Sequence, residues 1–144
     1  MISMKVINGE GLILGRVGSF VAKQVLSGDE VVLLNAEKLV ISGNIAYNTT
    51  KYSERRHLTN KANPENSPHW PKRPDLFVKR IIRGMLPFDS LRGREAAKRL
   101  RVFIGVPKAY AKTKAETLEK ASVDNLRGIY STIGKICERL GYEG

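Results

Sequence analysis

Residues 5–35, KVINGEGLILGRVGSFVAKQVLSGDEVVLLN, decide the fold. Lys5-Val6-Ile7 predicts a short strand, and the continuous apolar run at 31–35 is typical of a strand that is covered on both faces. Between them, apolar residues recur at 3.6-residue spacing over 14–27, which predicts a helix that ends at Gly28. The order strand, helix, strand favours a right-handed crossover and hence a parallel sheet.

The rest of the chain is expected to extend this unit. Further strands are predicted at 39–41 and 102–104. Helices are predicted at 45–58, from Pro74 to about Met85, at 94–100 and, as an amphipathic C-terminal helix, at 122–142. Four prolines within 59–74 exclude regular structure, so an extended basic loop is expected there.

The composition indicates one domain, residues 1–144, that binds a polyanion. With 144 residues and 42% hydrophobic content, the chain is long enough for a single domain with its own core. The net charge of +11 and the pI near 10.0 favour a nucleic acid or an anionic membrane surface as the partner. No apolar run reaches the roughly 18 residues of a membrane span, and the N-terminus does not resemble a signal peptide, so a cytoplasmic location is expected.

The positive charge is concentrated in the middle of the sequence. Residues 1–50 carry four Lys and Arg against four Asp and Glu, and residues 121–144 carry three of each kind. Residues 51–120 carry 18 against 7, which is the whole excess. A solvated surface is one explanation, but solubility needs only mixed charge; a basic surface that faces phosphates also explains the concentration.

Fourteen basic residues are predicted to contact RNA. Cations neutralise phosphates, arginines bind them with two parallel hydrogen bonds, and the aromatic rings interleaved with them can stack on unpaired bases. Trp70 is one such ring, although it could equally pack its loop onto the domain. Arg16, at a helix start, either meets an external phosphate with the help of free backbone N–H groups or is an exposed arginine without a special partner. The predicted set is Arg16, Lys51, Arg55, Arg56, Lys61, Lys72, Arg73, Lys79, Arg80, Arg83, Arg92, Arg94, Lys98 and Arg99.

A search for chemical motifs predicts no catalytic, cofactor or metal site. The segment 9–18 is rich in glycine, but it has no third glycine at the position that a dinucleotide fingerprint requires. It also has no Gly-Lys-Ser/Thr sequence of a P-loop. His57 and His69, with a single cysteine far downstream, give no zinc-ligand spacing. Cys137 lies on the apolar stripe of the last predicted helix, so a buried, inert thiol is expected rather than a nucleophile. We therefore expect no cofactor, no metal and no small-molecule substrate.

A series of short motifs runs through the chain. The most specific is Arg-Gly-Met-Leu-Pro at 83–87, which is followed by Arg92-Gly93 and by LRVFIGVP at 100–107. Others are Leu-Gly-Arg at 14–16, VLLNAE at 32–37 and Ser-Gly at 42–43. Together they resemble the L13 family of large-subunit ribosomal proteins over nearly the whole chain. His69, ahead of two prolines, and the stretch 130–140 are similar to the archaeal and eukaryotic branch of that family.

This resemblance implies a three-layer α/β/α fold with a four-stranded parallel sheet between helices. It also implies binding to large-subunit rRNA among neighbouring ribosomal proteins, a role early in subunit assembly, and no catalytic residues. Two other function classes compete with it. A nucleotide-dependent enzyme would need the missing phosphate motifs or paired carboxylates. A freestanding module for membranes or DNA would need a helix that pairs a basic face with an exposed aromatic apolar face, or a recognition helix, and the sequence predicts neither.

Overall fold

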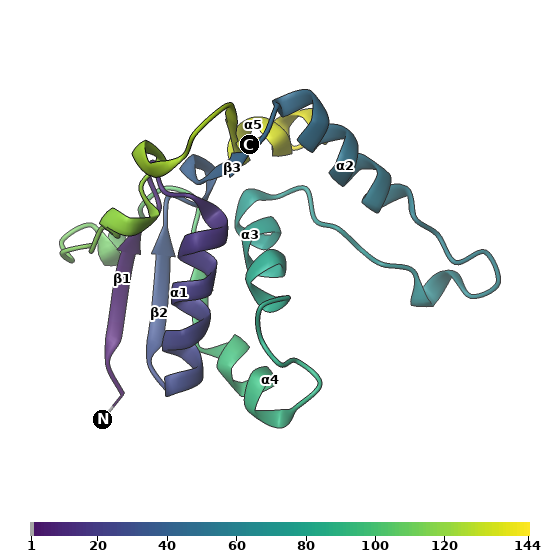
Figure 1. The fold of residues 1–144 in the computed structure, drawn as a ribbon. Coiled ribbons are helices and arrows are strands. Elements are labelled where there is room, and N and C mark those ends of the chain that lie inside the picture. The colour runs from purple at the N-terminus through teal and green to yellow at the C-terminus, as the bar shows by residue number, and fades with distance from the viewer. Residues whose placement is uncertain (1) are drawn as a thin grey trace.

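Three parallel strands form the main sheet of the computed structural model, which describes residues 2–144 (Figure 1). The strands are β1 (Met4–Asn8), β2 (Glu30–Leu34) and β4 (Leu100–Val102), in the order β1-β2-β4. The helix α1 (Leu14–Ser27) joins β1 to β2, which confirms the predicted strand–helix–strand unit. Gly28 ends this helix with a φ of 106°, in the left-handed region that favours glycine.

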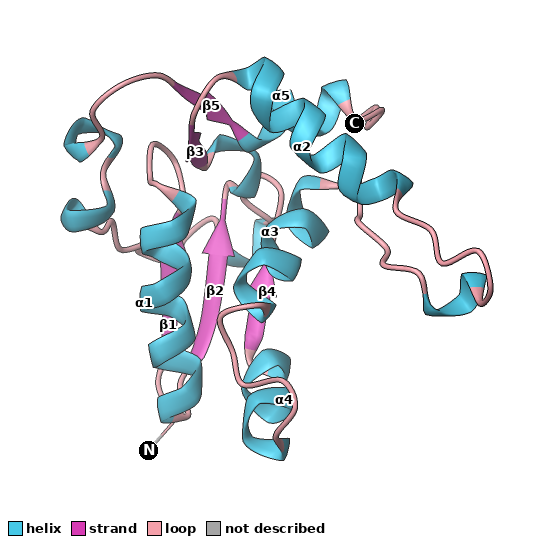
Figure 2. Ribbon diagram, turned by 45° about the vertical axis from the view of Figure 1, so that its right-hand side comes forward, coloured by secondary structure: helices cyan, strands magenta, loops and turns pink. Residues whose placement is uncertain are grey.

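Helices cover one face of the main sheet (Figure 2). α1 packs against α3 (Pro74–Arg83) and α4 (Leu91–Lys98), and both of these helices contact β4. Val31 and Leu33 of β2 are fully buried in the core on this side. α2 (Ile45–His57) packs against α5 (Ile133–Arg139) at the carboxyl end of the main sheet. No helix within residues 2–144 is both long and apolar enough to cross a bilayer.

Within residues 2–144 the opposite face of the sheet has no helical layer, so the expectation of three layers is wrong. Val32 and Leu34 form a small second cluster with Val6, which Phe103, Tyr110 and Ala115 cover. The covering segment contains only a 3-10 turn at Lys108–Tyr110. Gly105 has a φ of 66° and Pro107 follows two residues later, so the chain cannot continue as a helix across this face of the sheet.

The fourth strand is also not part of the main sheet. β3 (Val40–Ser42) pairs antiparallel with β5 (Tyr130–Thr132) in a separate two-stranded sheet. Only a short connection with a 3-10 turn at Ala36–Lys38 separates β2 from β3. A parallel neighbour would need a crossover of about a dozen residues or more, which this connection cannot supply. The prediction of four parallel strands is therefore corrected to three.

The C-terminal helix is much shorter than the expected 122–142. Residues before α5 form a 3-10 turn at Val123–Asn125 and then β5. Gly128, with a φ of 105°, interrupts the helical pattern, and the backbone of β5 is committed to its ladder with β3. Ile133 and Cys137 of the helix that does form are fully buried, so only the second half of the predicted apolar stripe is correct.

The remaining boundaries follow local chemistry. α2 and α3 match the predicted helices closely, whereas α4 begins at Leu91 instead of Arg94 because Ser90 caps it. β4 lies two residues ahead of the predicted strand. Residues 58–73, which we call the arm, contain a 3-10 turn at Pro64–Asn66 and otherwise irregular chain that projects away from the rest of the protein (Figure 1).

Candidate nucleic-acid interface

Trp70 fastens the base of the arm to the core. Its ring centroid lies 5.4 Å from that of Tyr52 on α2 and 5.9 Å from that of Phe77 on α3. Tyr52 and Phe77, both buried, make an edge-to-face contact with centroids 4.7 Å apart. Trp70 itself is half-buried against the main core. Of the two roles expected for this residue, the structure shows the one that packs the loop onto the domain.

Two arginines lie over the Trp70 ring. The guanidinium carbon of Arg80 is 4.5 Å from the ring centroid, and that of Arg55 is 5.1 Å from it. At these distances the ring attracts each cation, while the guanidinium N–H groups stay available for an outside acceptor. Together with Arg83 they line a cleft of about 410 Å³ between α2, the arm and α3, which we call the Trp70 cleft.

The Trp70 cleft has a positive charge that nothing in its lining offsets, because no acidic side chain lines it. Partial burial, and after it repulsion from two neighbouring arginines, lowers the pKa of Arg80 below its usual value. Among the fourteen predicted residues, within residues 2–144, only Arg73 has a carboxylate within salt-bridge distance, that of Asp75 at 3.0 Å. Cations that repel each other in this way are suited to a polyanionic partner.

A second cleft continues this basic surface along α3. It encloses about 280 Å³, and its cationic lining consists of Lys79, Arg80 and Arg83, with His69 at the arm. Lys51 joins the group from α2, with its ammonium 5.5 Å from the Tyr52 ring centroid. The structure therefore brings together five members of the predicted set, Lys51, Arg55, Lys79, Arg80 and Arg83, while Lys61 is exposed on the arm.

A tight turn between α3 and α4 explains the most specific motif in the sequence. Ser90 caps α4, because its Oγ accepts a hydrogen bond from the backbone N–H of Gly93 at 3.2 Å. A Cβ at Gly93 would lie 2.1 Å from the carbonyl oxygen of Pro87, so a side chain at this position would collide with the backbone. Pro87, the last residue of the motif at 83–87, thus packs so closely against Gly93 that the turn requires both.

The turn presents the cations of α4 in different ways. Arg92, Arg94 and Lys98 are exposed, and Arg94 also donates from Nε and Nη2 to the carbonyl oxygens of Ser90 and Asp89, both at 3.4 Å. Arg99 is half-buried instead, and its Nη1 donates to the carbonyl oxygen of Val25 at 3.1 Å. This bond ties the end of α4 to α1, so the position of Arg99 follows from the fold alone.

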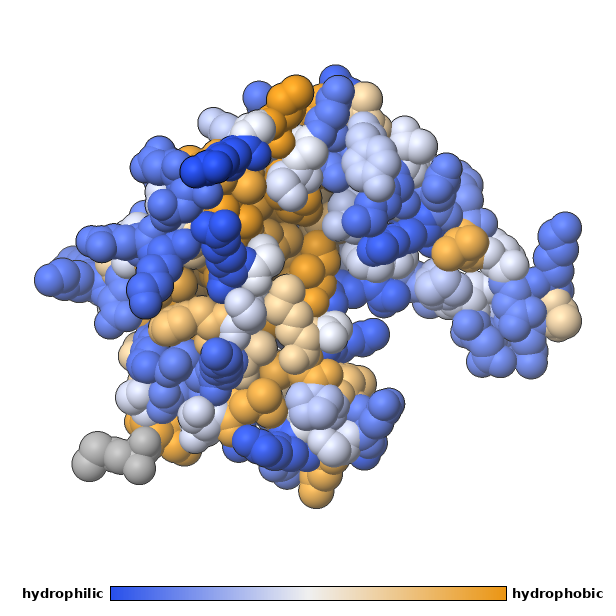
Figure 3. Space-filling view, viewed as in Figure 1, coloured by the Kyte–Doolittle hydropathy of each residue, from blue (hydrophilic) through white to orange (hydrophobic). Residues whose placement is uncertain are grey.

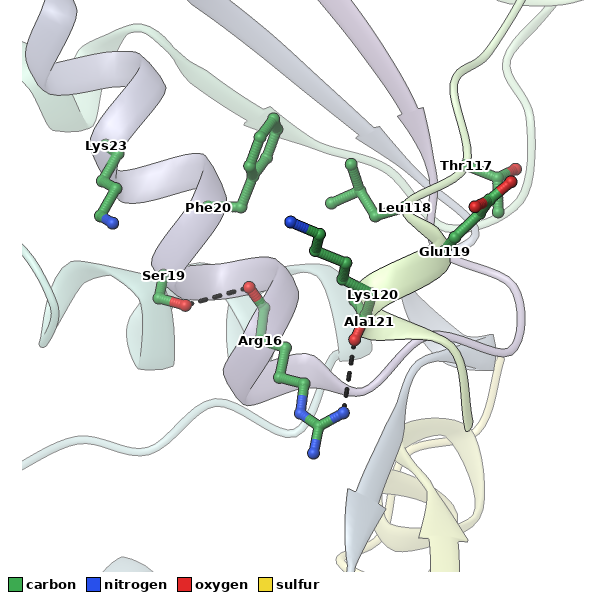
Figure 4. A pocket seen from close by; sticks show the side chains of 9 residues that line it. All are labelled: Arg16, Ser19, Phe20, Lys23, Thr117, Leu118, Glu119, Lys120 and Ala121. Atoms are coloured by element: carbon green, nitrogen blue, oxygen red, sulfur yellow. Dashed lines mark hydrogen bonds between the residues drawn. The ribbon is translucent and has the colours of Figure 1, made fainter. Parts of the chain in front are cut away.

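Arg16 lies apart from both clefts, at the start of α1. Its Nη1 donates to the backbone carbonyl of Lys120 at 3.3 Å (Figure 4). Both residues border a cavity of about 680 Å³ between α1 and residues 117–121, in which the side chains of Phe20 and Leu118 face each other. Sequence reasoning missed this cavity, because no spacing in the polar segment around residue 117 signals that it packs beside α1.

Arg56 and Lys72 face a different pocket, between the C-terminal ends of α2 and α5. This pocket, of about 240 Å³, is also lined by His57 and Arg139, and we call it the α2–α5 pocket. Sequence reasoning missed Arg139, which lies in a stretch whose positive and negative charges balance. Only the convergence of two helix ends in the fold makes it a neighbour of the predicted cations.

The basic middle of the sequence divides between two faces of the protein. Residues 51–99 carry 13 Lys and Arg against 5 Asp and Glu, and hydrophilic side chains cover the arm and the neighbouring part of α2 (Figure 3). Beyond β4 the chain crosses to the other face of the main sheet and reaches the outer edge of β1, where Ile7 pairs with Glu116. The exposed Lys112 and Lys114 therefore lie on the opposite side from the Trp70 cleft.

The surroundings of Cys137 suit a structural thiol. The side chain is fully buried, as expected. Burial, followed by the negative charges of Asp75 and Glu138, raises the pKa of the thiol to about 12, so it stays protonated and non-nucleophilic at neutral pH. Within residues 2–144, no group of three or more His, Cys, Asp or Glu is close enough together to hold a metal ion.

Comparison with known proteins identifies the family of the chain. A family model described as ribosomal protein L13 matches residues 3–109, well over half of the chain. The chain belongs to the ribosomal protein L13 family. The large ribosomal subunit protein uL13 of Methanosarcina barkeri is 45% identical over 140 residues, covering 96% of this chain and 98% of that protein. Its counterpart in Methanocaldococcus jannaschii is 50% identical over 106 residues, or 73% of this chain and 77% of that protein.

Membership of the L13 family confirms the resemblance that the motifs carry, and the two relatives are archaeal, as expected for the archaeal and eukaryotic branch. It places the chain among ribosomal proteins and not among enzymes. The matched region contains the Trp70 cleft, the turn at Gly93 and fourteen of the fourteen predicted basic residues. Arg139 of the α2–α5 pocket and the wall at 117–121 lie beyond the region that the L13 family model matches, although the Methanosarcina barkeri relative aligns over nearly the full chain.

Proposed function

We propose that this chain is a structural protein of the large ribosomal subunit that binds large-subunit rRNA and supports an early step of subunit assembly. Its partners would be that rRNA and the adjacent ribosomal proteins, and its location the cytoplasmic ribosome. The names of its relatives support the subunit assignment. The observation that carries the RNA-binding role is the Trp70 cleft, where three arginines converge with no carboxylate in the lining. RNA phosphates supply the negative charge that this cleft lacks.

The proposed interface follows the face that carries α2, the arm, α3 and α4. Guanidinium groups stacked on an indole are held in place before binding, which reduces the side-chain entropy lost when they engage phosphates. The exposed arginines of α4 extend the same face beyond the turn. We propose all fourteen predicted residues as RNA contacts, of which Arg16 lies apart from this face, at the start of α1, and Arg99 is the least supported because its guanidinium is used inside the fold.

A pair of charge-matched variants tests the proposed interface. Arg80→Gln with Arg83→Gln removes two cations from the Trp70 cleft, and Lys112→Gln with Lys114→Gln removes two exposed cations from the opposite face. Binding to fragments that tile the large-subunit rRNA is followed by fluorescence of Trp70, the single tryptophan of the chain. Circular dichroism checks that each variant is folded.

The salt dependence of binding distinguishes the two pairs. Each phosphate contact contributes a slope of about −0.7 to −0.9 to log affinity against log salt. The variant at Arg80 and Arg83 should therefore flatten the slope by roughly 1.4 to 1.8, and the variant at Lys112 and Lys114 by much less. Equal effects of the two pairs would show that the Trp70 cleft is not the RNA-binding surface.

The assembly role has its own test. The protein should remain with the large subunit through a high-salt wash, and it should already be present in the smallest precursor particles separated on a gradient. Absence from the precursors but presence in the mature subunit would overturn the early step and leave the subunit assignment standing.

A further inference from the structure

We propose that the α2–α5 pocket is a second phosphate site, separate from the Trp70 cleft, which binds one phosphate group of the rRNA backbone. The inference rests on the rRNA binding proposed above, and it adds Arg139, which the sequence did not predict, to the predicted Arg56 and Lys72 as one site. Three cations from three distant segments form it: Arg56 at the end of α2, Lys72 at the base of the arm and Arg139 at the end of α5.

The pocket lacks the negative charge that would offset these cations. The other residues of its lining are Ser53, His57 and Leu140, so no carboxylate is present there. Within residues 2–144, none of the three cations lies within salt-bridge distance of an Asp or Glu. Three positive side chains that face one small space repel each other unless an anion joins them.

The ends of the two helices at the pocket offset only part of the positive charge of these three cations. α2 and α5 both end at the pocket, and the carbonyl end of each helix carries about half a negative charge. Arg56 uses one N–H at such an end, because its Nη1 donates to the carbonyl oxygen of Leu140 at 3.3 Å. Lys72 lies beside Gly141, where a Cβ would come within 3.2 Å of its Nζ. Two helix ends thus offset roughly one charge of three.

Donors remain free after these contacts are counted. A guanidinium has five N–H groups, and the bond to Leu140 uses one of those on Arg56. Arg139 is exposed in the last turn of α5 and has no carboxylate partner among the described residues. These groups can donate together to the oxygens of one phosphate, which accepts several hydrogen bonds at once.

The size and place of the pocket favour a backbone phosphate. At about 240 Å³ the pocket is smaller than the sites that hold drug-sized ligands, which begin near 300 Å³, so it suits a single phosphate group. Arg56 also follows directly on Arg55 of the Trp70 cleft. An RNA strand that passes the end of α2 can therefore place one phosphate at each site.

A phosphate in this position would connect three separate segments of the protein. Lys72 belongs to the arm, whereas Arg139 belongs to α5. A shared phosphate would hold both to the end of α2. RNA binding would then add a link to the contacts that Trp70 and the buried face of α5 already make with the core.

The two histidines of the chain make the sites separately observable. His57 lines the α2–α5 pocket, and His69 lines the cleft beside Arg80. The Nδ1 of His57 lies 2.7 Å from the carbonyl oxygen of Ser53, which can only accept, so Nδ1 carries the proton and the ring is held in one orientation. Proton NMR of the two imidazoles therefore reports each site at constant pH and ionic strength.

The test compares Arg139→Gln with Lys135→Gln, which removes an exposed charge from the same helix outside the pocket. In the wild-type protein, inorganic phosphate should shift the His57 signals to saturation. Arg139→Gln should weaken this response roughly two- to fivefold, as expected for one partly solvated ion pair, and leave the His69 response unchanged. Lys135→Gln should match the wild type. Lys72→Gln, a change in the arm, repeats the test without altering α5.

A second arm of the experiment uses the rRNA fragment identified for the Trp70 cleft. Arg139→Gln should flatten its salt slope by about 0.7 to 0.9, and Lys135→Gln should not. Identical slopes for the two variants, with a phosphate response at His57, would mean that the pocket takes a free ion and would overturn the backbone contact. If Arg139→Gln and Lys135→Gln responded alike both to inorganic phosphate and to the rRNA fragment, the phosphate site itself would be overturned, while rRNA binding by the Trp70 cleft would stand. If the wild-type protein bound none of the rRNA fragments, the proposed function would be contradicted instead.

Discussion

The β1–α1–β2 unit and the region from α2 to α4 hold their shapes by different means. The first is stabilised by apolar burial and a parallel ladder, with Val17, Val21 and Leu33 fully buried, and residues 1–50 carry no net charge. The second is stabilised by an aromatic cluster around Trp70, by arginines stacked on it and by a turn that requires glycine. It also carries most of the net positive charge.

This difference indicates which region needs a partner. Burial of apolar side chains stabilises the first unit without any outside group. In the second region, cations are held near one another at Arg55, Arg80 and Arg83, and their repulsion falls when phosphates arrive. The β1–α1–β2 unit, with α1 packed against α3 and α4, therefore needs no charged partner, whereas the basic region is preorganised for a polyanion.

The largest expected effect is a collapse of the turn in the basic region. Gly93→Ala places a Cβ where the structure leaves 2.1 Å to the carbonyl oxygen of Pro87. Because the obstacle is backbone, we expect a loss of about 3 kcal/mol or more in the free energy of unfolding, measured by urea denaturation. Gly18→Ala is the matched control, since its closest neighbour is the flexible end of the Met85 side chain at 2.9 Å. Equal losses from the two variants would mean that the contact of Gly93 with the Pro87 backbone is no tighter than the contact of Gly18 with the Met85 side chain.

The sequence predicted the first unit well because its signals are local. Helical periodicity over 14–27 and a stop at Gly28 predicted the first and the last residue of α1 correctly. The pairing of β3 with β5 could not be predicted in this way, because it joins residues about ninety positions apart and depends on where the chain returns. The same long-range pairing shortened the C-terminal helix.

The candidate site was predicted in composition but not in geometry. Counting charge along the sequence identified the basic middle, and it included all five cations around α3 and the arm. It could not show that the chain changes faces after β4, which sends Lys112 and Lys114 to the other side. Arg139 was missed because it lies in residues 121–144, whose charges balance. The fold brings this stretch against the basic residues Arg56 and Lys72.

A smaller effect is expected from loosening the arm. Trp70→Ala removes the ring that joins the arm to Tyr52 and Phe77, and we expect a loss of about 2 kcal/mol in the free energy of unfolding, because the side chain is half-buried. Thermal or urea unfolding measures the change. Trp70→Phe should restore part of it. No loss of stability would show that the aromatic cluster does not hold the arm.

Amide exchange sharpens this prediction within the arm. In the free protein, residues 58–69 should exchange fast, because they are exposed and their prolines prevent regular structure. Exchange should slow when rRNA binds, and Trp70→Ala should extend the fast region toward Pro74. Strong protection of residues 58–69 without RNA would show that the arm is ordered by the protein alone.

A third, smaller loss concerns the shared core under both regions. Cys137→Ala should cost roughly 1 to 2 kcal/mol in unfolding free energy and leave rRNA binding intact, because it only removes a small buried group. The wild-type thiol should resist alkylation at pH 8 in the native state and react once the protein is unfolded. Loss of RNA affinity in a folded variant would contradict the structural role.

The pH dependence of Cys137 has a definite sign. In the unfolded chain the thiol ionises near its ordinary pKa of 9.0, whereas in the folded protein its pKa is about 12. The folded state therefore holds the proton more tightly, and the contribution of this group to stability is lost as the pH rises from about 9 toward 12. Cys137→Ala should remove that part of the alkaline destabilisation in unfolding curves.

The smallest effect should be a gain, in the neutral unit. Gly15 lies exposed in the first turn of α1, and a Cβ there meets nothing within 4 Å. Gly15→Ala should therefore raise the free energy of unfolding by about 0.5 kcal/mol, because alanine loses less backbone entropy in a helix. Because glycine has no side chain with which to contact RNA, affinity for the rRNA fragment should not change, even though Arg16 beside it is among the proposed contacts. A stabilised variant with weakened RNA binding would mean that RNA approaches the start of α1 closely enough to need glycine. The RNA-binding surface would then include the backbone at the start of α1 and not only the Arg16 side chain.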